Sequence, residues 1–205
     1  MIEQGSNEWK LLRSGNVTAS RIADVIAKTK SGYSTSRDNY MTELVIERFG
    51  VISEGFTSAA MQYGIECEPF ARATYESLND VMVTQIDYVP HPSIKRSGAS
   101  PDGLVNDGLV EIKCPNSTTH FNYLVAGEIP EKYKPQMAWQ MACTGAKWCD
   151  FVSFDNRVPK GLQYFKIRYP RDDEYIAMLE GEVTKFLLEV DAKFEVLQRK
   201  LKKLE

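Results

Sequence analysis

The chain has 205 residues, 43% of them hydrophobic and 26% charged, and a formal net charge of −3. These values are typical of an ordinary globular protein with enough apolar material for a core, and they exclude a disordered or strongly basic chain. No apolar run approaches the roughly 20 residues that cross a bilayer, and the first residues lack the features of a secretion signal. We therefore expect one α/β domain over residues 1–205, in the cytoplasm, with reduced cysteines.

The first part of the sequence predicts helices separated by a polar loop. Ser6 is the expected N-cap of a short helix that ends near Gly15, and further helices are expected over 19–27 and 37–49. The segment 28–36 between the last two is basic and contains glycine and several serines, which predicts a mobile loop.

A longer helix is predicted over about 57–78. Ala60, Gly64 and Glu68 lie one helical turn apart and share a line on its surface. The two small residues would let another element approach closely, and Glu68 would project where that approach opens. The remaining patterns predict strands over 81–89, 94–99, 146–154 and 163–169, and helices over 117–126, 133–143 and 172–204.

The stretch 97–115 contains the strongest candidates for catalytic residues. It reads SGASPDGLVNDGLVEIKCP. The tripeptide NDG at 106–108 lies between short apolar runs and strongly indicates a hairpin turn. A hairpin would fold the second arm beside the first. The carboxylates of Asp102 and Glu111 are therefore expected to lie close together, although they are nine positions apart.

Alternation along the second arm defines its two faces. Glu111 and Lys113 are expected on one face, while Val110 and Ile112 point into the core. Two carboxylates beside a lysine suit a hard divalent cation, which can activate water for attack on a phosphate. Taken alone, the same residues also fit an ordinary turn followed by a solvated strand edge.

Four ordered segments carry a resemblance to a known family. They read EQGSNEWKLLRSGNVTAS, MQYGIECEPFARATYE, SPDGLVNDGLVEIKCP and KPQMAWQMACTGA. The third segment resembles the core of the PD-(D/E)xK nuclease superfamily. Together the four resemble the phage-type alkaline exonucleases, the group of bacteriophage lambda exonuclease and the YqaJ-like viral recombinases. We therefore expect a restriction-endonuclease-like α/β core, with a central mixed β-sheet flanked by helices and a long C-terminal helix.

The resemblance also implies an activity. It implies ATP-independent, processive 5′-to-3′ digestion of one strand of linear double-stranded DNA, leaving a 3′ single-strand overhang. The implied cofactor is Mg²⁺ or Mn²⁺, as two ions in each active site. The implied partners are DNA ends, two further copies in a homotrimer ring and a single-strand annealing protein, in the bacterial host cell of a phage or prophage. The alternatives are a structure- or sequence-dependent endonuclease on the same fold, and a non-catalytic DNA-end-binding subunit.

Carried over residue by residue, the resemblance implies roles in metal binding, catalysis and DNA contact. The implied metal ligands are Asp102, Glu111, Glu68 and the carbonyl of Ile112. Lys113 would orient or activate the attacking water, and Gln136 would line the active site. The residues implied to hold the 5′-terminal phosphate are Arg13, Ser20 and Ser100, and Met61 stands where the family has a branched aliphatic wedge.

Two of these assignments have close competitors nearby. Glu68 competes with Glu66, and it could instead pair with Arg72 one turn along the helix surface. Gln140 is as good a polar candidate as Gln136.

Other assignments also leave an alternative open. Lys113 is either a base or a positioning cation, since burial lowers a lysine pKa and nearby carboxylates oppose that change. Arg13 could be a surface helix residue, and Ser20 a first-turn serine. The lysines of 28–30 either contact a DNA backbone or form a solvated charged run. His120 is expected to be exposed on its helix.

Overall fold

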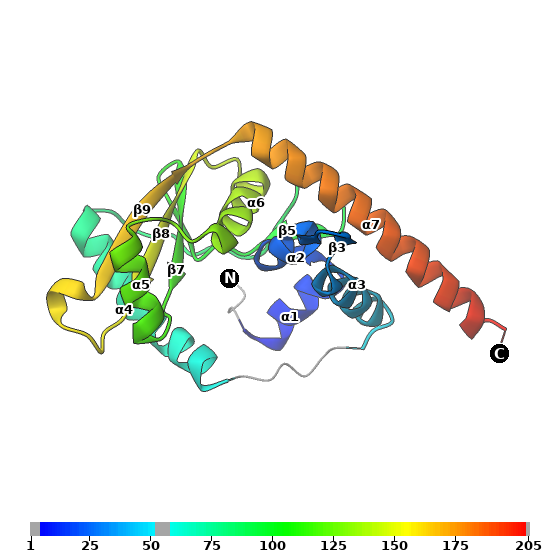
Figure 1. Ribbon diagram of the computed structural model, residues 1–205, viewed down its shortest axis with the longest axis horizontal. Helices are drawn as coiled ribbons and strands as arrows, with labels where there is room; N and C mark the ends of the chain where they lie inside the picture. Colours follow the sequence, from blue (N-terminus) through cyan, green and yellow to red (C-terminus); the bar gives the residue numbers. More distant parts are fainter. Residues whose placement is uncertain (1–4, 52–57, 204–205) are drawn as a thin grey trace.

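The computed structural model describes residues 5–51 and 58–203 (Figure 1). The helices are α1 (Asn7–Arg13), η1 (Ala19–Arg21), α2 (Ile22–Ile26), α3 (Thr35–Arg48), α4 (Ala59–Asn79), α5 (Ser117–Ala126), η2 (Glu131–Tyr133), α6 (Lys134–Thr144), η3 (Lys160–Leu162) and α7 (Asp173–Leu201), where η marks a 3₁₀ helix. The strands are β1 (Val17–Thr18), β2 (Lys28–Thr29), β3 (Gly32–Tyr33), β4 (Val89–Pro90), β5 (Ser97–Ala99), β6 (Gly103–Val105), β7 (Gly108–Lys113), β8 (Trp148–Phe154) and β9 (Tyr164–Pro170).

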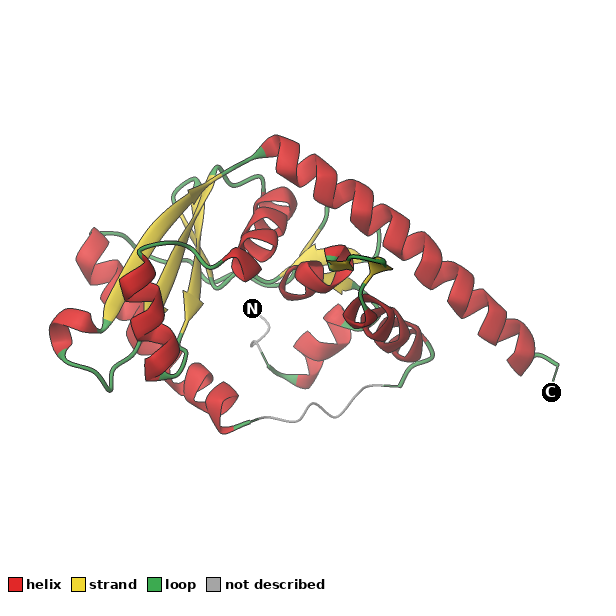
Figure 2. Ribbon diagram, in the orientation of Figure 1, coloured by secondary structure: helices red, strands yellow, loops and turns green. Residues whose placement is uncertain are grey.

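A mixed sheet in the order β6-β7-β8-β9 forms the centre of the fold, with helices against it (Figure 2). Strands β6 and β7 are antiparallel, as are β8 and β9, whereas β7 and β8 run parallel. A parallel pair needs a long crossover, and here α5, η2 and α6 supply it. The predicted α/β architecture, with a central mixed sheet flanked by helices, is therefore confirmed.

Both faces of this sheet are buried. Helix α4 covers the face that carries Val110, Ile112 and Val152. Helices α5 and α6 cover the opposite face, where Phe151 packs against tyrosines of α5 and η2. The alternation predicted for β7 is thus correct, but its second face is also part of the core rather than a solvated edge.

A second group of elements packs beside the sheet. It consists of α1 to α3, the small sheet β1-β5-β4 and the long helix α7, which runs across the molecule and extends past α3 (Figure 1). Arg37 of α3 is buried, donates to the carbonyl of Val25 at 3.1 Å and pairs with Glu189 of α7 at 2.6 Å. The expected long C-terminal helix is confirmed, and its buried stripe faces α2, α3 and α6.

Two local predictions were wrong. Residues 28–36 contain the short hairpin β2–β3 and the start of α3 instead of a mobile loop. Tyr33 and Lys28 both donate hydrogen bonds to Glu182 of α7, at 2.6 and 2.9 Å. Glu182 is 149 or more positions away in the sequence, and these two contacts hold the hairpin in place. Residues 81–88 pair with β6 only at the isolated bridge between Thr84 and Leu104, because the N–H groups of Val81 and Val83 donate to Glu76 of α4 instead of to a strand.

The other boundaries agree within a few residues where the structure describes them. The predicted helix start at Thr57 and helix end at Leu204 lie outside the described residues. The cap of α5 is Asn116, which accepts from the amide of Thr119 at 2.8 Å. The four cysteines are unpaired, as expected. No helix in the described residues has the length and apolarity to cross a membrane.

Candidate active site

The hairpin β6–β7 positions the predicted acidic residues. Val105 pairs with Gly108, and Asn106 between them adopts a left-handed backbone with a φ of 52°. Trp148 donates to Asp107 at 2.9 Å, and a Cβ at Gly108 would come within 2.2 Å of the Trp148 ring. Only glycine fits there, so the indole fixes the turn. The register places Asp102, one residue before β6, opposite the second half of β7.

Asp102 lies at the end of this ladder. Its Oδ2 accepts the backbone N–H of Ile112 at 2.6 Å, which fixes the carboxylate beside β7. Burial raises the pKa of Asp102 well above its usual range, and the negative charges of Glu111 and Glu68 raise it further. The predicted approach of Asp102 to Glu111 therefore occurs, and the carboxyl group of Glu68 is close enough to act on it.

Glu111 is fully buried, with an exposed fraction of 0%. Gln136 donates to one of its oxygens at 2.5 Å, and Gln140 donates to the other at 2.6 Å. Both glutamine candidates, Gln136 and Gln140, therefore contact Glu111. The partly exposed Gln136 is on the side of Lys113, and the buried Gln140 supports Glu111 from behind.

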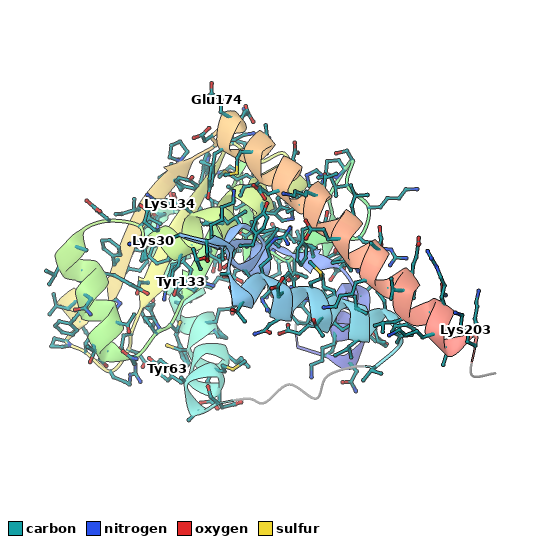
Figure 3. All side chains as sticks on the ribbon, turned by 45° about the vertical axis from the view of Figure 1, so that its right-hand side comes forward. Lys30, Tyr63, Tyr133, Lys134, Glu174 and Lys203 are labelled. Carbon is teal, nitrogen blue, oxygen red and sulfur yellow. The ribbon has the colours of Figure 1, made fainter. Side chains whose placement is uncertain are left out.

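Lys113 lies at the end of β7 and forms an ion pair with Glu111. Its ammonium group is 5.1 Å from the centre of the Tyr133 ring, and Tyr133 is next to the start of α6 (Figure 3). Burial acts to lower the pKa of Lys113, but Glu111 and Asp102 outweigh burial and raise it. In this arrangement Lys113 is a cation.

Helix α4 contributes the third acidic residue. Glu68 lines a cavity of about 520 Å³ together with Asp102 and Lys113. Glu66 does not line this cavity, and its carboxylate accepts a hydrogen bond from the side chain of Gln62 at 2.7 Å. Glu68 also forms an ion pair with Arg72 at 2.5 Å. It therefore both lines the acidic cavity and pairs with Arg72 along the helix, as the two alternatives described.

The small residues of α4 open the cavity instead of packing against another element. Ala60 and Gly64 line it, and no atom lies within 4 Å of the position a Cβ would take at Gly64. Met61 lines the same cavity and is 55% exposed at the first turn of α4.

The acidic residues fit a divalent cation by their chemistry, although the described part of the chain contains no preformed cluster of three or more His, Cys, Asp or Glu side chains around one point. Glu111 is held by two glutamines and Lys113, and Glu68 by Arg72. Converging carboxylates repel one another, and their hard oxygens suit Mg²⁺ or Mn²⁺. A bound cation would therefore relieve the repulsion at Asp102.

A second cavity, of about 310 Å³, lies beside α1. Arg13 and Ser20 both line it, and Arg13 donates to the hydroxyl of Ser100 at 3.0 Å. The guanidinium of Arg13 stacks 4.0 Å from the centre of the Trp9 ring. No carboxylate in the described residues forms a salt bridge with Arg13, although Glu43 and Glu47 line the same cavity. The three residues expected at a phosphate are thus brought together.

Sequence reasoning missed or misjudged some residues. His120 was expected to be exposed, and this was wrong: it is fully buried between the hydroxyl of Ser153 and the carbonyl of Leu162, each at 2.7 Å. Tyr133, which lies under Lys113, was not identified, and no local pattern marks it. The supporting role of Gln140 was signalled only by its spacing of one turn from Gln136.

Comparisons with known proteins agree on one family. The sequence profile of the YqaJ-like viral recombinase domain matches residues 8–147. The chain is similar to the crystal structure of an alkaline exonuclease, LHK-Exo, from Laribacter hongkongensis, with a TM-score of 0.92 and 49% identity over 98% of this chain and 100% of that one. It is also similar to LHK-Exo in complex with dAMP, with a TM-score of 0.91 and 48% identity over the same shares of both chains.

A more distant structure shares the fold alone. It is a phage-related exonuclease from Haemophilus somnus 129PT, with a TM-score of 0.66 and 14% identity over 91% of this chain and 96% of that one. No curated protein matches the sequence. Because the domain profile covers more than half of the chain and a full-length relative is 49% identical, this chain belongs to the YqaJ-like viral recombinase family.

Proposed function

We propose that this protein is a metal-dependent, ATP-independent exonuclease that digests one strand of linear double-stranded DNA from its 5′ end. Family membership and the near full-length similarity to an alkaline exonuclease support exonuclease activity. The relative has been crystallised with dAMP, a deoxynucleotide, which is the class of product that an exonuclease releases.

The observation that carries the 5′-end specificity is the bond from Arg13 to Ser100. Ser100 precedes Asp102 by two residues, so this bond joins the cavity with the arginine to the cavity with the acidic residues. A guanidinium fork and serine hydroxyls suit a terminal phosphate. With the phosphate held by Arg13, Ser20 and Ser100, the first phosphodiester would lie at a set distance beside Asp102 and Lys113.

The residues of the acidic cavity would have different roles in phosphodiester hydrolysis. Asp102, Glu111, Glu68 and the carbonyl of Ile112 would hold two Mg²⁺ or Mn²⁺ ions, which when bound supply an activated water and stabilise charge on the phosphate. Gln136 and Gln140 orient Glu111 through its two oxygens. Lys113, held as a cation beside Glu111, is placed to orient the attacking water and to stabilise negative charge on the phosphate.

The proposal extends to the assembly. A homotrimer ring around the duplex would retain the DNA by its topology, which suits a chain with a net charge of −3 and explains how digestion could be processive without a strongly basic surface. The 3′ single strand would pass to a single-strand annealing protein during phage or prophage recombination in a bacterial host. Met61 at the mouth of the cavity would separate the terminal base pair.

The direct test is digestion of an end-labelled linear duplex. We expect Mn²⁺- or Mg²⁺-dependent release of nucleotides from 5′-phosphorylated ends, no release in chelator, and no cutting of covalently closed circular duplex. Nucleotide release is followed by gel electrophoresis over time. Cutting of closed circles would instead favour an endonuclease on this fold, and binding of ends without release would favour a non-catalytic subunit.

The phosphate pocket makes a separate prediction. Arg13→Ala should lower the preference for 5′-phosphorylated over 5′-hydroxyl ends by about 10-fold or more, since a charge-assisted hydrogen bond contributes about 1.5–3 kcal/mol. The preference is measured as the ratio of the two kcat/KM values. Arg21→Ala is the matched control, because Arg21 lines the same cavity but is paired with Asp24 and Glu43. An unchanged ratio in Arg13→Ala would place the phosphate elsewhere.

A further inference from the structure

Two clusters, each with a buried aspartate, an arginine and a tyrosine, attach α4 to the sheet. In the first, the fully buried Asp155 follows β8 and accepts the hydroxyl of Tyr63 at 3.0 Å. Arg157 donates to Asp155 through Nε at 2.8 Å and through Nη2 at 3.1 Å, and its guanidinium lies 3.8 Å from the centre of the Tyr63 ring. We call these residues the Asp155 cluster. Tyr63 lies in the first half of α4 (Figure 3).

The second cluster repeats this chemistry at the other end of α4. The fully buried Asp150 of β8 accepts the hydroxyl of Tyr75 at 2.9 Å. Arg168 donates to Asp150 through Nε at 2.8 Å and through Nη2 at 3.0 Å, and its guanidinium lies 3.5 Å from the centre of the Trp148 ring. We call these residues the Asp150 cluster.

Only the Asp155 cluster touches the walls of the acidic cavity. Arg157 Nη2 also donates to the carbonyl of Pro115 at 2.9 Å, and Pro115 lines the cavity two residues after Lys113. Tyr63, the α4 residue of the same cluster, is followed by Gly64, which lines the cavity on the same helix as Glu68. A single buried carboxylate thus connects the helix that carries Glu68 to the turn that follows Lys113.

We propose that the Asp155 cluster positions the active site by setting the separation between Glu68 on α4 and the end of β7, and that the Asp150 cluster supports the fold alone. This inference rests on the proposed function. Groups that orient metal ligands from behind affect metal affinity and rate by about 10- to 100-fold when they are removed. None of Asp155, Arg157 and Tyr63 lines the acidic cavity itself, so we assign them a positioning role.

The two clusters supply their own matched control. Arg157→Ala removes the link to Pro115, and Arg168→Ala removes the equivalent fork from Asp150. The side chains of Arg157 and Arg168 are 42% and 52% exposed, so neither truncation leaves a cavity in the core. Each variant leaves its buried aspartate with the tyrosine hydroxyl, and Asp150 also keeps Lys166 at 3.8 Å. Tyr63→Phe and Tyr75→Phe form a second matched pair if an arginine variant fails to fold.

The experiment measures Mn²⁺ binding by titration calorimetry, cleavage of 5′-phosphorylated duplex, and thermal unfolding in chelator. We expect Arg157→Ala to weaken Mn²⁺ binding about 10-fold and to lower kcat with little change in KM for DNA ends. Arg168→Ala should keep the Mn²⁺ affinity and kcat of the unsubstituted protein. Both variants should unfold at reduced temperatures, and Arg157→Ala at the lower of the two, because Asp150 keeps Lys166 at 3.8 Å.

Two results would overturn the inference in distinguishable ways. Equal Mn²⁺ affinity and equal kcat in the two arginine variants, or in the two tyrosine variants, would make the Asp155 cluster structural only. Failure of the unsubstituted protein to bind Mn²⁺ or to release nucleotides would overturn the proposed function, and the positioning role with it.

Discussion

Lys113→Ala is expected to lower the rate of nucleotide release by about 10²- to 10³-fold, the contribution typical of a preorganised donor that stabilises charge in the transition state. The ammonium group of Lys113 contacts Glu111, and its pKa is raised mainly by Glu111 and Asp102 against the effect of burial. Removing the side chain leaves the attacking water without this partner. The fold should persist, because Gln136 and Gln140 still donate to Glu111.

The measurement is single-turnover cleavage of a 5′-phosphorylated duplex, with DNA-end affinity measured separately in Ca²⁺. Lys132→Ala is the control. Lys132 lies 4.8 Å from the centre of the same Tyr133 ring, but it is exposed and contacts neither acidic residue. We expect Lys132→Ala to cleave at the rate of the unsubstituted protein. A Lys113→Ala variant with undiminished turnover would remove this lysine from the mechanism.

Asp102→Asn is expected to abolish most cleavage, by about 10³-fold, since ligands of a catalytic metal support several kcal/mol of transition-state stabilisation. The same change should raise the unfolding temperature in chelator. Burial and the charges of Glu111 and Glu68 raise the pKa of Asp102 in the folded state, so its ionised form costs stability at neutral pH. Asparagine removes this charge and still accepts the N–H of Ile112.

Thermal unfolding with and without Mn²⁺ tests this prediction. The unsubstituted protein should gain stability from Mn²⁺, because a ligand that binds only the folded state stabilises it, and Asp102→Asn should gain far less. Asp107→Asn is the control in the same hairpin. Hydrogen bonds from Trp148 and, to a smaller extent, from Lys147 lower the pKa of Asp107. Replacing the Asp107 carboxylate should therefore not raise the unfolding temperature. A Mn²⁺-dependent gain that survives in Asp102→Asn would place the metal elsewhere.

The sequence was sufficient to predict the central hairpin because its determinants are local. A turn signal and strict alternation together define which side chains of 102–113 lie near one another, and the observed register agrees. The same holds for α6, where a spacing of four residues places Gln136 and Gln140 on one side of the helix, toward Glu111.

Features that depend on contacts distant in the sequence could not be predicted. The hairpin at 28–36 is held by Glu182 on α7, and His120 is buried by Ser153 and Leu162. The segment 81–89 has strand propensity but finds little backbone to pair with. Propensity is a weak prior wherever tertiary partners decide the outcome. The Asp155 cluster likewise joins residues more than 90 positions apart, and no motif connects them.

The two-residue connection between Val105 and Gly108 limits how this family can vary. Adding or deleting one residue there would rotate every later side chain of β7 by half a turn about the strand. Glu111 would then face α4, and Ile112 would face the glutamines of α6. Insertions elsewhere on the surface change only local structure, whereas a single-codon indel at this position would invert the catalytic strand, so natural variants should keep this connection at constant length.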